Sequence, residues 1–209
     1  MGIGAAEATR WVTLSAEAIT AARDELTRLD SAIGDADHGA NMDRGFKAAV
    51  EKLSSDPPGD PAAVFKAVGM TLLSKVGGAG GPLYGTFFMK LADPVADKQE
   101  LEPEDWAAAL RAGVEGVMGR GKAQVGDKTM VDALVPGVEA LEAAVGEGVP
   151  LADALERSSA AAAEGVEATV ALVARKGRAS YLGERSAGHQ DPGATSSQLL
   201  LHTAAEAFS

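Results

Sequence analysis

The sequence predicts one all-α domain built as a helical bundle. Hydrophobic residues make up 46% of the 209 residues, which indicates a folded core, and this length fits one domain. Aromatic residues make up only 4% while glycine contributes 25 residues, a balance that favours closely packed helices over a β-sandwich. Apolar residues recur near the 3.6-residue helical period from end to end, and no stretch shows strand-like alternation. We therefore expect a single domain over residues 1–209 with about eight helices.

The first expected helix covers residues 7–30, where Trp11, Leu14 and Leu26 fall near one face. The same period continues through the rest of the chain. The other expected helices cover residues 42–53, 60–76, 82–97, 103–118, 129–145, 150–176 and 193–208. The two linker-like stretches between helices are short enough to be connections within one bundle, so we expect no domain boundary.

Proline and acidic residues mark several helix starts. Asp60 and Pro61 form an N-cap and first-turn pair. Pro103 is followed by two acidic residues, which suits the positive end of a helix dipole. Pro136 falls inside an expected helix and should kink or split it, because proline lacks the N–H that the helix needs.

Composition excludes several classes of site. The 30 acidic residues outnumber the 19 basic ones and give a net charge of −11, which argues against nucleic acid as a partner. Because there is no cysteine, any metal site must use oxygen or imidazole ligands. The N-terminus lacks signal-peptide features, and the charge-free stretch at residues 76–89 is too short to cross a bilayer. We therefore expect a cytoplasmic protein that does not bind membranes.

Four loops interrupt the helical pattern with glycine and polar residues. They read "GDADHGAN" at 34–41, "GGAGGPLYG" at 77–85, "GRGKAQVGDKTM" at 119–130 and "KGRASYLGERSAGHQDPGATS" at 176–196. They follow the first, third, fifth and seventh expected helices. Alternate connections of an antiparallel bundle lie at the same end, so the four loops are expected to form one site.

The acidic loop is the strongest candidate for a metal site. Asp30, Asp35 and Asp37 can surround one or two hard cations with water completing the coordination. An EF-hand does not fit, because its twelfth position would be Phe46. The alternative is that Asp30 and Asp37 only cap helices. Asp43 lies further along the same acidic stretch, and the family resemblance described below implies that it is an acid on the helix surface.

The other loops offer groups that bind phosphate. The glycines before Pro82 expose backbone N–H groups at a helix start, although a flexible turn explains them equally well. Arg178 matches the geometry of a phosphate, although a salt bridge is the alternative. Asp127 and Thr129 are candidates for capping the helix that follows them. Together with the acidic loop, these groups suit a nucleotide held through a metal-bridged diphosphate.

In these four loops and their order, the sequence resembles the nucleotide-binding L subunit of bacterial dihydroxyacetone kinase. The likeness extends over essentially the whole chain. It implies an eight-helix antiparallel up-and-down bundle closed into a barrel, with ADP or ATP and two Mg²⁺ at one end. Asp30, Asp35 and Asp37 would hold the metals and, with Arg178, would form the catalytic set. The implied nucleotide contacts are His38, Gly39, Ala40, Asn41, Ala79, Gly80, Gly121, Met130, Arg178, Asp191, Pro192 and Gly193.

The resemblance also implies an activity and partners. The subunit would transfer a phosphoryl group from the Mg-bound nucleotide to dihydroxyacetone on a K subunit, and an M subunit would rephosphorylate the bound ADP from phosphoenolpyruvate. A homodimer or a hetero-complex is expected. The alternatives are the L component of an ATP-dependent ketose kinase and a non-catalytic Mg-ADP-binding regulator. One residue departs from the family pattern, because Gly80 stands where a serine is usual.

Overall fold

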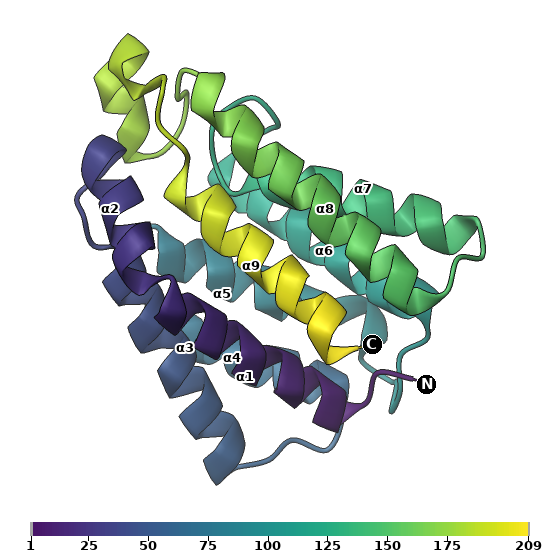
Figure 1. The fold of residues 1–209 in the computed structure, drawn as a ribbon. Coiled ribbons are helices and arrows are strands. Elements are labelled where there is room, and N and C mark those ends of the chain that lie inside the picture. The colour runs from purple at the N-terminus through teal and green to yellow at the C-terminus, as the bar shows by residue number, and fades with distance from the viewer. Residues whose placement is uncertain (1, 209) are drawn as a thin grey trace.

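The computed structural model describes residues 2–208, and these form an all-helical bundle, as predicted (Figure 1). The α-helices are α1 (Ala5–Ala21), α2 (Arg23–Ile33), α3 (His38–Ser55), α4 (Pro61–Lys75), α5 (Gly80–Leu91), α6 (Pro103–Gly121), α7 (Val131–Gly146), α8 (Leu151–Ala168) and α9 (Pro192–Ala207). Short 3₁₀ helices are η1 (Asp93–Val95), η2 (Thr169–Ala171) and η3 (Arg178–Ser186). Within the described residues there is no β-strand, and Ile3 and Leu101 form an isolated antiparallel bridge.

The helix expected over residues 7–30 is divided in two at Ala22. The Ala22 N–H still donates to the Ala18 carbonyl oxygen (2.9 Å), but the backbone there has ψ of 1° and leaves helical geometry. The remaining expected helices each correspond to one α-helix. The expected segment 150–176 is shorter than predicted, because α8 ends at Ala168 and η2 follows it.

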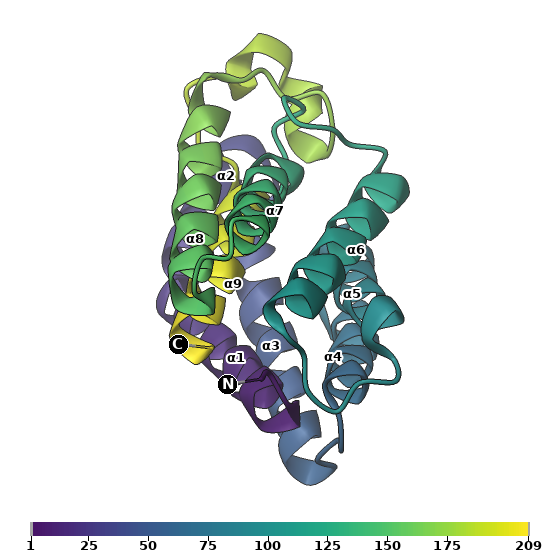
Figure 2. The same cartoon turned by 90° about the vertical axis from the view of Figure 1, so that its right-hand side faces the viewer.

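Consecutive helices pack against each other, and α9 returns to pack against both α8 and α1 (Figures 1 and 2). Both chain ends lie at the same end of the bundle (Figure 2). An aromatic cluster fills the core there. Trp11 and Trp106 meet edge to face at 5.1 Å between ring centroids, and Trp11 Nε1 donates to the Leu200 carbonyl oxygen (2.8 Å). The buried aromatic rings therefore form part of the core at this end of the bundle.

The helix starts predicted at Asp60–Pro61 and at Pro103 are confirmed, whereas the predicted split at Pro136 is not found. Asp60 caps α4 by accepting the Ala63 N–H (2.7 Å), with Pro61 in the first turn. Pro136 does not split its helix, because α7 runs through it. Packing against α8 supports this region: a Cβ at Gly165 would lie 2.1 Å from the Asp132 carbonyl oxygen, so the two helices touch backbone to backbone.

Asp43 on α3 is buried, although it was expected on the helix surface. It is 8% exposed and accepts hydrogen bonds from Thr20 Oγ1 (2.6 Å) and Lys47 Nζ (2.9 Å). The surface position was implied by the family resemblance, and the contact with Thr20 of α1 places the carboxylate between two helices instead. In the part of the chain that the structure describes, no helix combines the length and the apolar character that a membrane crossing requires.

Candidate nucleotide and metal site

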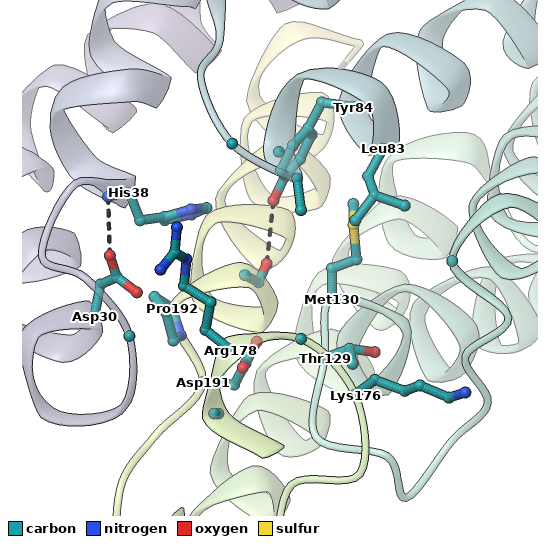
Figure 3. Close-up of a pocket in the computed structure, with 18 of the residues that line it drawn as sticks. Asp30, His38, Leu83, Tyr84, Thr129, Met130, Lys176, Arg178, Asp191 and Pro192 are labelled. Atoms are coloured by element: carbon teal, nitrogen blue, oxygen red, sulfur yellow. Dashed lines mark hydrogen bonds between the residues drawn. The ribbon is translucent and has the colours of Figure 1, made fainter. Parts of the chain in front are cut away.

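The end of the bundle away from the termini encloses a cavity of about 490 Å³. Its volume falls within the range of roughly 300–1,000 Å³ that is typical of ligand pockets. All four loops singled out in the sequence contribute to its lining, as the alternation of connections predicted. Figure 3 shows Asp30, His38 and Arg178 on one side of the cavity, facing Leu83, Met130 and Lys176 on the other. The acidic residue Asp30 is thus on one side of the cavity, and the opposite side combines the apolar Leu83 and Met130 with the cationic Lys176.

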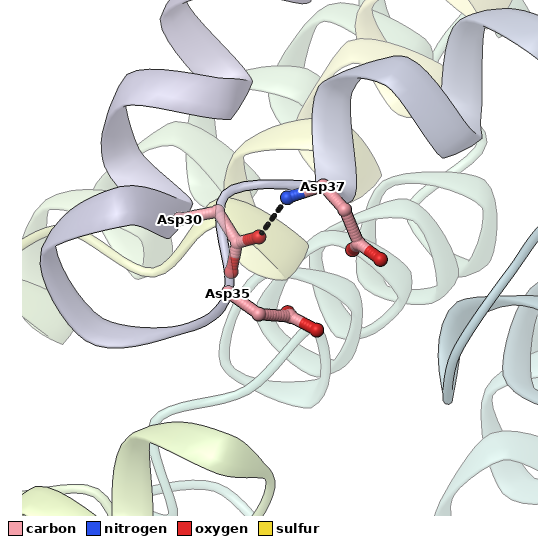
Figure 4. A group of neighbouring side chains, drawn as sticks. All are labelled: Asp30, Asp35 and Asp37. Carbon is pink, nitrogen blue, oxygen red and sulfur yellow. Dashed lines mark hydrogen bonds between the residues drawn. The ribbon is translucent and has the colours of Figure 1, made fainter.

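Three carboxylates converge where α2 passes into α3 (Figure 4). Asp30, Asp35 and Asp37 each offer an oxygen, and the three oxygens lie within 4.8 Å of one another. Asp30 is buried, and its Oδ2 accepts the backbone N–H groups of Asp37 (2.9 Å) and His38 (3.1 Å). These bonds leave Oδ1 for a cation. The donor set and spacing fit Mg²⁺, which favours carboxylate oxygens.

The backbone of this loop is shaped to bring the carboxylates together. A Cβ at Gly34 would lie 1.9 Å from Asp30 Oδ1, so a side chain there would displace the carboxylate. Ala36 has a φ of 61°, an unfavourable value for a residue other than glycine. Such local strain persists where the surroundings impose it and is typical of functional loops. Asp37 holds the N-cap position of α3 without a side-chain cap bond, so capping does not occupy its carboxylate.

Arg178 lies at the start of η3 and pairs with the acidic cluster. Its NH2 is 2.9 Å from Asp35 Oδ2, and the two side chains are 66% and 34% exposed. The salt bridge that was the alternative role for Arg178 is thus made at the mouth of the cavity, to the predicted metal ligand Asp35. The guanidinium offsets part of the charge that the three neighbouring carboxylates would otherwise concentrate.

The glycine-rich loop places a helix start at the cavity. The helix α5 begins at Gly80, two residues before the expected start, and has no side-chain cap. Gly78 has a φ of 62°, a conformation that glycine adopts at low cost. The uncapped N–H groups at the first turn of a helix bind anions. The loop therefore places an uncapped helix start at the cavity.

A hydrogen-bonded network joins three helices beside the acidic cluster. The Nε2 atom of His38 shares a hydrogen bond with Ser196 Oγ (2.8 Å), and Ser196 in turn bonds Tyr84 (2.6 Å). Tyr84 also bonds Ser197 Oγ (2.9 Å), and burial raises its pKa to about 12, so the phenol stays neutral. Burial lowers the pKa of His38, which keeps its imidazole neutral near pH 7. The network fixes His38 at the cavity wall.

Two buried aspartates shape the remaining wall. Asp191 caps α9 by accepting the Ala194 N–H (2.7 Å), and burial raises its pKa to about 7. Asp132 in α7 accepts the N–H groups of Gly126 (2.6 Å) and Thr129 (2.7 Å), which folds the loop before α7. Asp132, which lies in the first turn of α7, therefore holds the preceding loop against the start of its own helix.

The two predicted capping residues of this loop have different roles. Thr129 Oγ1 accepts the Val131 N–H (3.2 Å) at the start of α7, as expected. Asp127 does not cap α7, because its carboxylate instead accepts the Gln124 N–H (3.0 Å) inside the loop.

Most residues predicted for the nucleotide site line the cavity. These are Asp30, Asp35, Asp37, His38, Asn41, Ala79, Gly80, Gly121, Met130, Arg178, Asp191, Pro192 and Gly193. Gly39 and Ala40 are not part of the lining. Gly39 faces α2, where a Cβ would lie 2.1 Å from the Arg23 carbonyl oxygen. The sequence reasoning missed Tyr84, Ser196 and Lys128, because a polar residue in a helix or loop gives no sign of its partners.

Comparison with known proteins places the chain in a family. The DAK2 domain model matches residues 32–206. The chain is 46% identical over 201 residues to the ADP-binding subunit DhaL of the PEP-dependent dihydroxyacetone kinase of Escherichia coli (strain K12), with 96% of each chain covered.

Two crystal structures of the dihydroxyacetone kinase of C. freundii share the fold. The native form has a TM-score of 0.75 at 25% identity over 96% of this chain. The form in complex with AMP-PNP and Mg²⁺ has a TM-score of 0.76 at 24% identity over 99% of it. In both cases the match covers 34% of the longer C. freundii chain. By the family match and its near-complete alignment with an ADP-binding subunit, the chain belongs to the DAK2 domain family.

Proposed function

We propose that this protein is the ADP-binding subunit of a phosphoenolpyruvate-dependent dihydroxyacetone kinase. The observation that carries the proposal is the convergence of four separate loops on one cavity that combines three carboxylates, an arginine and an uncapped helix start. The 46% identity to an E. coli subunit of that name, over 96% of both chains, supports the same assignment. We expect the protein to act in the cytoplasm, where its phosphoryl donors are found.

The nucleotide is proposed to lie across the cavity with its phosphates toward the acidic cluster. Asp30, Asp35 and Asp37 would hold two Mg²⁺ ions, whose charge stabilises the phosphates during transfer. The first turn of α5 would donate backbone N–H groups to the phosphates. The apolar side, which includes Leu83 and Met130, suits a planar base.

In the proposed reaction, the bond from the γ-phosphorus to the β–γ bridging oxygen breaks and a sugar hydroxyl oxygen bonds to that phosphorus. Arg178, at the cavity mouth, would offset charge on the moving group. The sugar and the base that accepts its hydroxyl proton would come from a K subunit, and an M subunit would return a phosphoryl group to the bound ADP. We therefore propose a hetero-complex as the working form.

Reconstitution tests this proposal. The purified chain is mixed with K and M subunits, phosphoenolpyruvate, dihydroxyacetone and Mg²⁺, and the phosphorylated sugar is measured. We expect product with catalytic amounts of ADP. Product with ATP but not with the M subunit would identify an ATP-dependent ketose kinase instead. ADP binding without turnover under either condition would identify a regulatory nucleotide-binding protein.

Gly80→Ser is expected to tighten ADP binding. The nearest atom to a Cβ at this position is Val76 Cγ1 at 3.2 Å, so a small shift of that methyl group accommodates the serine. A hydroxyl there can donate to a phosphate, and a net hydrogen bond contributes roughly 0.5–1.5 kcal/mol, or an about twofold to twelvefold lower Kd. Calorimetric titration with Mg-ADP measures the change. Gly80→Ala is the control for the added carbon, and equal affinity of the serine and alanine variants would contradict the expectation.

A further inference from the structure

Lys128 is a buried lysine in the wall of the cavity. The residue is 1% exposed, and its Nζ donates to three backbone carbonyl oxygens, those of Thr169 (2.6 Å), Leu172 (3.2 Å) and His189. An ammonium group has three N–H bonds, so its donors are fully used. Lys128 also has a φ of 62°. A residue other than glycine keeps this unfavourable conformation only where contacts with the surrounding structure hold it.

The three carbonyl groups lie at the two ends of one segment. We call residues 173–188 the strap. This segment connects η2 with the residues just before α9, and it contains Arg178. Thr169 and Leu172 stand before the strap, and His189 stands just after it. Two backbone hydrogen bonds also hold the ends of the strap. The Gly188 N–H donates to the Val170 carbonyl oxygen (2.7 Å), and the Arg175 N–H donates to the Asp127 carbonyl oxygen (3.0 Å). Lys128 therefore clamps both ends of the strap with one cation.

The charge of Lys128 also bears on the cavity wall. Its ammonium lowers the pKa of Asp191, while burial and the nearby carboxylate of Asp132 raise it. Burial in turn lowers the pKa of Lys128 itself. Withdrawing an ammonium from water is unfavourable; here three carbonyl oxygens accept its N–H bonds, and the charges of Asp191 and Asp132 act to raise its pKa. If Lys128 only filled space, the folded protein would be as stable or more stable with an apolar side chain of similar size at this position.

We propose that Lys128 is a positioning residue of the phosphoryl-transfer site: it clamps the strap so that Arg178 reaches the acidic cluster. The inference rests on the proposed function, because it gives the strap its role in nucleotide binding. Lys128 does not need to touch the nucleotide. It acts through the strap, whose Arg178 pairs with Asp35 at 2.9 Å, and through Asp191 at the start of α9.

Limited trypsin digestion of the ligand-free protein tests the clamp directly. The strap contains four trypsin sites, at Arg175, Lys176, Arg178 and Arg185. In Lys128→Met we expect trypsin to cleave the strap about tenfold faster or more, while the helices stay intact. The reason is that losing a charged hydrogen-bond donor raises the equilibrium constant for local opening of the strap by at least about tenfold. Lys122→Met is the matched control, because Lys122 lies in the same loop but is exposed.

Nucleotide binding supplies the functional readout. Mg-ADP titration of Lys128→Met should give a Kd raised about tenfold or more, and Lys128→Arg, which keeps the charge and donors, should recover part of the affinity. If the methionine variant does not fold, Lys128→Gln, which keeps two donors, takes its place in both assays. Wild-type strap cleavage and wild-type Kd in the folded variant would overturn the inference, and so would cleavage spread evenly over all helices.

The two proposals fail differently. If the wild-type protein does not bind Mg-ADP, the proposed function fails, whatever the strap does. If the wild type binds Mg-ADP but the Lys128 variants behave like Lys122→Met in both assays, the function stands and the clamp is wrong.

Discussion

Asp30→Asn is expected to lower phosphoryl transfer by about 10²–10³-fold, the range seen when one preorganised charge-stabilising group is removed. Asp30 is the buried member of the acidic cluster, and one of its oxygens lies within 4.8 Å of one oxygen each of Asp35 and Asp37. Asparagine keeps one carbonyl oxygen, which can still accept the N–H groups of Asp37 and His38. It removes the negative charge that a magnesium ion requires. The loss should therefore come from metal binding and not from unfolding of the loop.

The measurement is the rate of dihydroxyacetone phosphate formation in the reconstituted system as Mg²⁺ is varied. We expect the variant to need more Mg²⁺ for half-maximal rate and to remain slow at saturation. Asp24→Asn is the control, because this substitution makes the same chemical change at an exposed position of the same helix. A wild-type rate and a wild-type Mg²⁺ requirement in Asp30→Asn would leave the carboxylates with a capping role alone.

Arg178→Ala is expected to separate metal binding from nucleotide binding. The guanidinium occupies Asp35 Oδ2 at 2.9 Å in the ligand-free protein, so it competes with a cation for that carboxylate. Its removal should raise the affinity for a divalent ion alone by a few-fold, because the pair is exposed and worth about 0.2–1 kcal/mol. The same change should weaken Mg-ADP binding and slow transfer by about 10²-fold, since a cation is lost where charge develops on the phosphoryl group.

Titration with Mn²⁺ followed by its paramagnetic resonance measures the metal affinity, and calorimetry with Mg-ADP measures the nucleotide affinity. Arg185→Ala is the matched control, because Arg185 lies exposed in the same 3₁₀ segment and does not line the cavity. Metal and nucleotide affinities that fall together would mean that Arg178 supports the loop rather than competing for Asp35.

Much of the site could be predicted because its chemistry is concentrated in four loops. The three closely spaced carboxylates of the acidic loop indicate a cation, whereas the glycines before α5 and Arg178 each had another explanation and gained weight only in combination. The alternation of helix directions then placed the loops at one end without knowledge of any contact. Helix starts were predicted for a similar reason, since a residue such as Asp60 acts on N–H groups within its own turn.

The features that the sequence did not reveal depend on contacts between distant segments. Lys128 stands in a polar loop where a lysine is normally exposed, and only the approach of residues 169–189 buries it. Tyr84 and Ser196 are 112 positions apart and meet through tertiary packing. Pro136 remains inside α7 because α8 packs closely against the same turn. Local pattern carries no information on such contacts.

The central claim is that the three carboxylates hold magnesium for a nucleotide bound among the four loops. Calorimetric titration of the wild-type protein with ADP, with and without Mg²⁺, tests it most directly. Because metal-bridged binding depends on the ion, we predict that ADP binds at least about 10²-fold more tightly in the presence of Mg²⁺, and that Asp30→Asn loses most of this difference. An ADP affinity that is the same with and without Mg²⁺, or no ADP binding in either case, would contradict the account.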